Sequence, residues 1–495
     1  MNRPSLPRIA RRAVWMGVLA LLCAAIFSEG VHHADEHYQI LEFAGWKLGI
    51  TPADQLPWEF AERMRPALQP AIAVLVHRTL ALFGEPDPFV VAMLLRMLAA
   101  ALTFSAAILL LRGQLRDNPA LHEIGWLKLY LFLAFLLWFG VYCGVRFSSE
   151  GFSAALFAMG FAVVVHRKPD GRDWPLLFAG LLLGSAVVAR FQMALMVAGL
   201  LAWCIFITRM RWSAMGLIVV GGLVSVGLGA LIDRWFYGEW VFTAWNYIEL
   251  NVIQGKAAEF GTHPWWHYFA AIFERAVPPF SLLFLAPPLV LFALRRRSAL
   301  TWAVLPFLLG HMLIGHKEYR FMFPAVPLLP ALVVGGLHAM EERGWFGWLK
   351  VGAKHVLRTA LLVVHVPLLL VVLFKPAQDD IGFYKELYRI TQHGDMILHD
   401  NHDPYWQGNP IWYTRRNGVG IAPINSLTEW PSSGRVIYVA CVAEPNMPDP
   451  PRATLLYSSI PEWLLRINIG GWADRTAVWR IWELQRPADW RPVEH

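Results

Sequence analysis

The chain has 495 residues, of which 56% are hydrophobic and 16% are charged, and its formal net charge is +7. Soluble domains carry about a quarter of charged residues, so this composition excludes an ordinary soluble protein and predicts a polytopic membrane protein with a soluble portion. The positive charge does not indicate a nucleic-acid partner, because the basic residues cluster between apolar segments, as membrane topology requires. The four cysteines are spread out and show no zinc or disulfide pattern.

The first apolar segment, residues 14–27, directly follows Arg8, Arg11 and Arg12. A basic start before an apolar run predicts an uncleaved signal anchor whose N-terminus lies in the cytoplasm. The loop that follows, roughly residues 30–87, is then expected outside, in a periplasm or a lumen.

The stretch from His32 to Glu42 opens this loop and contains the adjacent acids Asp35 and Glu36. If it is helical, Asp35, Gln39 and Glu42 occupy positions i, i+4 and i+7 on one face. A carboxylate there can act as a general base while Gln39 and Glu42 hold a polyhydroxyl substrate. Taken alone, the stretch fits a solvated helix start better, where acids are stabilised by the helix dipole.

Further apolar segments alternate with short polar turns, and every turn expected in the cytoplasm is basic, as the positive-inside rule demands. These turns contain Arg112, Arg167, Arg209, Arg295 and Arg343. Eleven spans fit this pattern and place the C-terminus outside. After the first span, the expected segments are 88–111, 125–144, 151–166, 174–190, 191–208, 213–232, 278–294, 299–315, 322–340 and 358–374, with an interfacial helix at 67–83.

The last 120 or so residues have a mixed pattern. The stretches Met396–Leu398, Val436–Ala440 and Thr476–Leu484 are typical of strands. The sequence therefore predicts a mostly α, polytopic membrane module over residues 1–374 and a small α/β extracytoplasmic domain over residues 375–495.

Several charged residues lie at outer membrane ends, where the positive-inside rule does not explain them. They are His316, Lys317 and Arg320 after one span, and Arg146, Glu150 and Arg190 at two others. The first group can bind a lipid phosphate, since cationic side chains donate to its oxygens and stabilise a charged leaving group; the alternative is an interfacial anchor. The second group marks a substrate path or pairs between helices.

The second large outer loop, residues 233–277, is rich in aromatic residues. It contains Trp240 to Asn251 and then His263-Pro264-Trp265-Trp266-His267-Tyr268. Aromatic faces with interspersed amides and histidines suit sugar binding. Taken alone, the loop fits an interfacial aromatic belt better.

Four separated motifs together resemble those of glycosyltransferase family 22. They are His33 to Gln39, Leu56 to Phe60 with Arg65, His263 to Tyr268, and His316 to Phe321 followed by Pro324 and Pro327. Their order and spacing agree over roughly residues 14–340. The sequence departs from the usual motifs at Ala34, Pro57 and Tyr319, and none of these changes removes an ionisable group that the chemistry needs.

The resemblance implies the multispan GT-C fold, and because the tail and the motif departures differ from the eukaryotic pattern, we expect a bacterial member of the family. Such enzymes extend GPI anchors and the dolichol-linked oligosaccharide. They move a mannosyl or similar hexosyl residue, with inversion, from a polyprenyl-phosphate sugar to a lipid-linked glycan. The partners are this donor, this acceptor and membrane lipids, with no cofactor, metal or nucleic acid. The site would face the periplasm from the inner membrane, or the lumen from the ER membrane in a eukaryote.

The resemblance also implies roles for individual residues. Asp35 is the expected catalytic base, with Glu36 as the alternative. The residues assigned to the donor phosphate are His316, Lys317, Arg320 and Arg190. The substrate-binding candidates are Gln39, Glu42, Trp58, Glu59, Arg65, Arg146, Glu150, His263, Trp265, His267 and Tyr268.

Two alternatives stay open at this point. One is a related GT-C transferase that modifies protein or lipid A. The other is a transporter or flippase, although the sequence shows no pseudo-repeat and no paired broken helices of the kind that transporters use.

Overall fold

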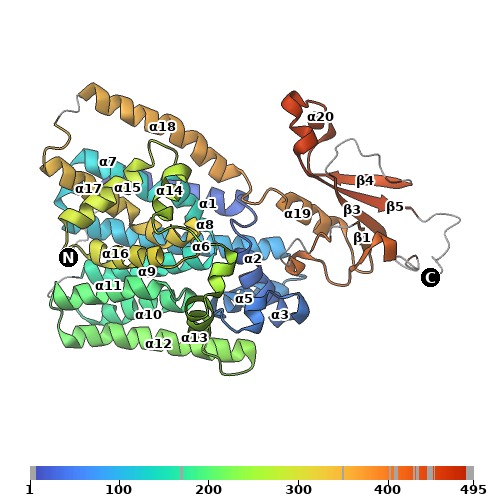
Figure 1. The fold of residues 1–495 in the computed structure, drawn as a ribbon, viewed down its shortest axis with the longest axis horizontal. Coiled ribbons are helices and arrows are strands. Elements are labelled where there is room, and N and C mark those ends of the chain that lie inside the picture. The colour runs from blue at the N-terminus through green and yellow to red at the C-terminus, as the bar shows by residue number, and fades with distance from the viewer. Residues whose placement is uncertain are drawn as a thin grey trace. The chain divides into compact units, whose positions relative to one another are not determined.

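A computed structural model describes residues 7–167, 171–347, 351–400, 403–405, 411–426, 430, 434–442, 450 and 452–485. The chain forms two compact units, whose elements are drawn in Figure 1. The first, here called the helical unit, contains Met1–Ser28, Glu59–Ile72 and Met93–Lys375. The second, the mixed unit, contains Glu29–Trp58, Ala73–Ala92 and Pro376–His495. Residues 30–58 and 73–87 of the first loop therefore group with the C-terminal residues, whereas residues 59–72 belong to the helical unit.

The helical unit is built from apolar helices joined by short turns. Its α-helices are α1 (Arg8–Phe27), α7 (Ile124–Phe135), α8 (Trp138–Val145), α9 (Ser149–Val165), α10 (Trp174–Ala189), α11 (Met193–Phe206), α12 (Trp212–Tyr237), α13 (Thr243–Ile248), α14 (His267–Arg275), α15 (Leu282–Leu294), α16 (Ala299–Leu313), α17 (Leu329–Glu342) and α18 (Val351–Phe374). The 3-10 helix η6 (Tyr319–Leu328) precedes α17. Helix α6 (Pro88–Asp117) has most of its residues here, and α5 (Leu68–Ala81) has its first turn here.

Within the described residues, five helical stretches are long and apolar enough to cross a membrane, and six shorter apolar helices have 10–17 residues. Together they coincide with the eleven apolar segments expected from the sequence, so the helical character of those segments is confirmed. The number of spans and the side that each turn faces stay predictions.

Helices α10 and α12 come into close backbone contact through glycines. A Cβ on Gly180 would lie 2.1 Å from the carbonyl oxygen of Ile218, and one on Gly221 would lie 2.2 Å from that of Leu177. Small residues allow this approach, and van der Waals packing then holds apolar helices together. Because α10 ends just before Arg190, this contact positions a candidate site residue.

The mixed unit contains a five-stranded sheet in the order β2-β1-β3-β5-β4. The strands are β1 (Met396–His399), β2 (Gly420–Pro423), β3 (Val436–Val442), β4 (Ala453–Ser458) and β5 (Val478–Leu484). Strand β1 pairs in parallel with β2 and β3, whereas β5 pairs antiparallel with β3 and β4. Three of these strands, β1, β3 and β5, lie where the sequence predicts them.

Helix α19 (Ile381–Ile390) packs on the sheet through its apolar side. Phe383 and Leu387 are fully buried against Ile437 of β3, and the ring of Phe383 stacks on Trp479 at 4.6 Å. Phe89 packs against the same cluster, so the segment 73–92 shares this core. The first loop contributes α2 (Asp35–His37), the π-helix η1 (Tyr38–Glu42) and α3 (Phe43–Leu48) to this unit, and the short α4 (Trp58–Ala61) lies at the boundary of the two units.

The glycine contact gives the first prediction. Gly221→Ala should lower the free energy of unfolding by about 1–3 kcal/mol, because the new methyl group meets backbone that cannot rotate away. Gly216→Ala, on the same helix, is the control, since a Cβ at Gly216 has no atom within 4 Å. It should leave the protein unchanged or slightly more stable, as alanine favours helix. Thermal unfolding of the purified protein in detergent measures both, and equal midpoints would contradict the close packing of α10 on α12.

Candidate active site

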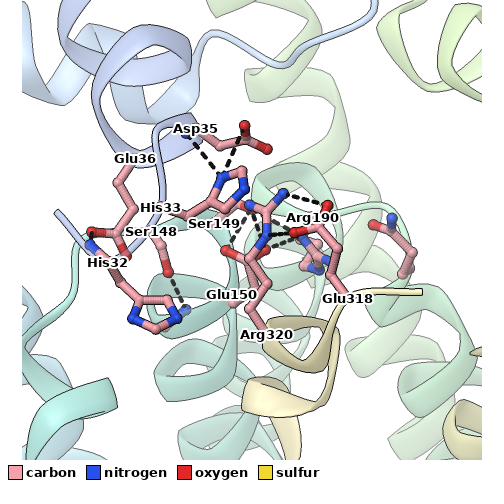
Figure 2. A network of polar contacts seen from close by, with 12 residues as sticks. His32, His33, Asp35, Glu36, Ser148, Ser149, Glu150, Arg190, Glu318 and Arg320 are labelled. Carbon is pink, nitrogen blue, oxygen red and sulfur yellow. Dashed lines mark hydrogen bonds and ion pairs between the residues drawn. The ribbon is translucent and has the colours of Figure 1, made fainter. Parts of the chain in front are cut away.

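The centre of the candidate site in the helical unit is the carboxylate of Glu150, which is 1% exposed. The hydroxyl of Ser148 caps α9 by accepting from the backbone N–H of Gly151 at 3.1 Å, which places Glu150 in the first turn. Glu150 Oε1 lies 2.9 Å from Arg190 Nη1 and 3.4 Å from Arg320 Nη1. Figure 2 shows the three side chains converging. Glu150 therefore joins α9, the end of α10 and η6.

A second acid, Glu318, continues this network. Arg320 donates from Nε and Nη2 to the two carboxylate oxygens of Glu318, at 2.5 and 3.0 Å. The ring Nε2 of His316 lies 3.1 Å from Glu318 Oε1, and its Nδ1 lies 3.0 Å from the carbonyl oxygen of Gly261. Acids and bases thus alternate from Arg190 to His316. The bidentate pair fixes the orientation of the Arg320 guanidinium.

Lys317 points in another direction and is 3% exposed. Its ammonium group donates to the carbonyl oxygens of His263 at 3.0 Å and Gly315 at 3.4 Å, and also to that of Ile314. Burial lowers the pKa of Lys317. In this conformation the lysine ties the turn after α16 to the aromatic loop.

The aromatic loop places its candidates in different surroundings. The rings of His263 and His267 stack at 4.0 Å, and Trp265 is 61% exposed, whereas Tyr268 is buried. Burial, and then the charges of His263 and Lys317, lower the pKa of His267, so this ring favours its neutral form. The loop therefore offers an exposed indole and two imidazole rings, groups that suit hydroxyl-rich ligands.

Glu59, Arg65 and Arg146 also have defined partners in the helical unit. Arg65 Nε donates to Glu59 Oε1 at 3.1 Å, and the guanidinium lies 5.6 Å from the ring of Tyr247. Arg146, 1% exposed, donates to the hydroxyl of Ser28 at 2.8 Å and to its carbonyl oxygen. Arg146 thus holds the end of α1.

In the mixed unit, the side chain of Asp35 is 12% exposed and has two neighbours from its own stretch. The hydroxyl of Tyr38 donates to Asp35 Oδ1, and the ring Nδ1 of His33 lies 3.1 Å from the same oxygen. Figure 2 shows His33 beside Asp35, and Glu36 bonded to the backbone N–H of His32 at 3.0 Å. The aspartate is therefore oriented by residues on either side of its own short helix. Gln39 is partly buried on the next turn, and Trp58 is partly buried at the end of the loop.

Glu42 has a different environment from the one that the helical spacing predicts. It lies in a π-helix and is 0% exposed. Its carboxylate accepts from Thr51 Oγ1 at 2.6 Å and from the backbone N–H of Tyr413 at 2.9 Å, and His37 Nε2 lies 2.7 Å away. The wider π turn breaks the i, i+7 alignment with Asp35. A role in holding the loop accounts for these contacts.

The structure thus brings Arg190, Glu150 and Arg320 together in the helical unit, with His316 reaching them through Glu318. The sequence did not identify Glu318 as the ion-pair partner of Arg320 and His316. It also did not identify His311, a buried histidine of α16, as a candidate site residue; the one hint is that His311 lies five residues before His316. Within the described residues, no group of three or more His, Cys, Asp or Glu side chains is placed to hold a metal ion.

The Alg9-like mannosyltransferase family model matches residues 13–401. GPI alpha-1,2-mannosyltransferase 3 of Mus musculus is 28% identical over 323 residues, which cover 63% of this chain and 55% of the mouse protein. GPI mannosyltransferase 3 of Trypanosoma brucei brucei is 28% identical over 354 residues, which cover 62% of this chain and 61% of that protein. The chain spans about half the length of the mouse protein.

The crystal structure of ArnT from Cupriavidus metallidurans bound to undecaprenyl phosphate is similar in fold. The superposition covers 96% of this chain and 98% of that chain, with a TM-score of 0.51 and 11% sequence identity. At this identity the likeness concerns the fold alone. It supports the GT-C fold that the four motifs predict.

The buried Glu150 gives the second prediction. Glu150→Gln should lower the free energy of unfolding by about 3–5 kcal/mol, because it leaves two buried guanidinium groups without their shared charge. Glu342→Gln is the control: it removes the Arg295 pair, whose side chains are about half exposed, and should cost under ~1 kcal/mol. Unfolding midpoints in detergent compare the two. A Glu150→Gln protein as stable as the control would contradict the role given to this carboxylate.

Glu42 gives the third prediction. Glu42→Gln should cost about 1–3 kcal/mol, because the amide turns a donor toward groups that need an acceptor. Glu386→Gln, in α19 of the same unit, is the control, since Glu386 pairs only loosely with the exposed Arg389 at 3.6 Å. Protease resistance of the full chain, followed over a urea series, reports both. Equal resistance would show that Glu42 does not hold the loop.

Proposed function

Because the chain belongs to the Alg9-like mannosyltransferase family, as its motifs predict, we propose that it is an inverting, integral-membrane mannosyltransferase. The donor is a polyprenyl-phosphate-linked mannose or a similar hexose, and the acceptor is a lipid-linked glycan. Transfer takes place on the extracytoplasmic face. The observation that carries the proposal is the family match over residues 13–401, which contains all four motifs.

Asp35 is the proposed base. It takes the proton of the acceptor hydroxyl while that oxygen attacks the anomeric carbon of the donor sugar. The bond from the anomeric carbon to the phosphate oxygen breaks on the opposite side, so the configuration inverts and polyprenyl phosphate leaves. Tyr38 and His33 support this role, since their contacts orient the carboxylate. Glu36 is the alternative base.

The basic residues near Glu150 are the proposed site for the donor phosphate. Arg190 and Arg320 are both held by the buried carboxylate of Glu150, and Arg320 also by the half-buried Glu318, so their positions are fixed before a ligand arrives. Fixed donors stabilise the negative charge that builds on the leaving oxygen. His316 supports this site indirectly, because its ring contacts Glu318, which orients Arg320. Lys317 acts with them, by shaping the turn or by turning its ammonium group to the phosphate.

The proposed sugar and acceptor contacts come from the remaining candidates. Trp265 offers an exposed ring for stacking, and His263 and His267 offer hydroxyl partners. Positioning roles are proposed for Gln39, Glu42, Trp58, Glu59, Arg65, Arg146, Glu150 and Tyr268.

Two further observations support the donor class and the sidedness. The ArnT crystal structure with a similar fold was solved bound to undecaprenyl phosphate, which is an isoprenoid phosphate. The turns after alternate spans carry arginine, which supports a location of the motif-bearing loops away from the cytoplasm. We propose a bacterial inner membrane with the site toward the periplasm; the same charge pattern describes an ER membrane with the site toward the lumen.

Asp35 gives the fourth prediction. Asp35→Asn should reduce transfer by at least about 10²-fold, the usual contribution of general-base catalysis, without loss of expression. Asp54→Asn is the control, because Asp54 is an exposed residue of the same loop. Membranes containing each variant are incubated with labelled polyprenyl-phosphate mannose, and label in glycolipid is counted. Wild-type rates from Asp35→Asn would remove this residue from the mechanism, and label that crosses the membrane without joining a glycan would indicate a transporter.

A further inference from the structure

Among the buried side chains of the helical unit that carry polar atoms without a hydrogen-bond partner among the described residues, three lie on neighbouring elements: Arg190, Tyr268 and His311. The atoms are Nε and Nη2 of Arg190, the hydroxyl of Tyr268 and Nε2 of His311. These residues are 6%, 1% and 2% exposed. Buried polar groups are normally paired, so a cluster of unpaired ones marks a place where a ligand or ordered water supplies the missing contacts.

Arg190 and His311 lie beside the aromatic ring of Phe321 in η6, and Tyr268 lies beside His311. The guanidinium carbon of Arg190 lies 5.1 Å from the centre of this ring, and the ring of His311 lies 6.3 Å from it. The ring of Tyr268 lies 6.5 Å from that of His311. Four elements therefore contribute: the end of α10, α14, α16 and η6.

Arg190 and Tyr268 also interact electrostatically. Burial raises the pKa of the Tyr268 hydroxyl, and the charge of Arg190 acts on it in the opposite direction. The phenol stays protonated at neutral pH and is available as a donor. A cation and a phenol hydroxyl thus share this region.

The hydrogen bond of His311 determines which ligand group it can take. Its Nδ1 lies 2.8 Å from the carbonyl oxygen of Phe307, one turn earlier in α16. A carbonyl only accepts, so Nδ1 carries the hydrogen of the neutral ring and Nε2 is a bare acceptor. A hydroxyl group can donate to Nε2, whereas an ionised phosphate has no hydrogen to donate.

We propose that Arg190, Tyr268 and His311 form the pocket for the sugar-phosphate end of the donor, in which His311 Nε2 accepts a hydrogen bond from a sugar hydroxyl. Arg190 donates to a phosphate oxygen, and Tyr268 donates to an oxygen of either part. The inference rests on the proposed function. It adds His311 to the site and assigns it to the sugar alone.

Two ligands test the assignment: a short-chain polyprenyl phosphate and the same compound carrying mannose. Both are titrated into the purified full-length protein in detergent. His311→Phe keeps a planar ring and removes the acceptor, so it should weaken binding of the mannosylated compound by roughly tenfold. It should leave binding of the sugar-free phosphate unchanged. Arg190→Lys should weaken both ligands, because both carry the phosphate.

His365→Phe is the matched control. His365 is also a buried histidine of an apolar helix, with an unpaired Nε2 and a ring packed on Phe132 at 4.5 Å. It lies in α18, away from the elements that form the pocket. Its replacement should leave both affinities as they are in the wild type.

Several results would overturn the assignment: unchanged binding of mannosylated donor by His311→Phe, an equal loss for both ligands, or the same loss in His365→Phe. A wild-type protein that binds neither compound would overturn the proposed donor class as well. A wild-type protein that binds both but transfers nothing would overturn the proposed reaction and leave the pocket in place.

Discussion

The buried carboxylate of Glu150 is the contact on which the helical unit's site depends. Two guanidinium groups, those of Arg190 and Arg320, are also buried there. Removing one such charge from water costs several kcal/mol unless an opposite charge compensates it. Glu150 supplies that charge from the first turn of α9, and Glu318 supplies a second one to Arg320. The cations can therefore stay charged and fixed in an apolar bundle.

The arrangement leaves capacity for one more anion. Arg320 is engaged in a bidentate pair, whereas Arg190 uses one nitrogen for Glu150 and has two buried nitrogens without a partner among the described residues. The two arginines thus have different functions in the same network. Arg320 is oriented by the carboxylates of Glu150 and Glu318. Arg190 is oriented by Glu150 through Nη1, and its Nε and Nη2 can still donate to a ligand. In the proposed function, the phosphate oxygen of the donor meets these nitrogens without rearrangement of the arginine.

Much of this site could be predicted from the sequence, because charge at an outer membrane end has no topological explanation. Arg146, Glu150, Arg190 and the 316–320 motif were identified in this way, and the family that the four motifs predict is confirmed. Their pairing could not be predicted. Which arginine meets Glu150 depends on how α9, α10 and η6 pack, and no local pattern records that. Of the two interpretations given for Arg146 and Glu150, pairing between an arginine and a glutamate of different elements describes Glu150. The arginines that it contacts are Arg190 and Arg320.

The prediction for residues 35–42 shows a second limit. The spacing of Asp35, Gln39 and Glu42 assumes 3.6 residues per turn, but the stretch from Tyr38 is a π-helix. Glu42 is consequently buried and meets Tyr413, 371 residues later in the chain. Strands β2 and β4 were missed for simpler reasons. Strand β2 has four residues with glycine first and proline last, and the register of β4 shifts between Leu455 and Tyr457.

The mixed unit shows that residues 30–58 and 73–87 of the first loop belong to a folded domain together with the C-terminal residues. Three separate points of its N-terminal segments are bonded to the C-terminal part of the chain: Glu29 to Lys385, Glu42 to Tyr413 and Glu85 to Arg416. A loop fixed in this way shares a folded core with the sheet and is not a free connection between spans. The family match ends at residue 401, before two of these partners. The backbone that carries Asp35 is therefore held in part by residues outside the matched region.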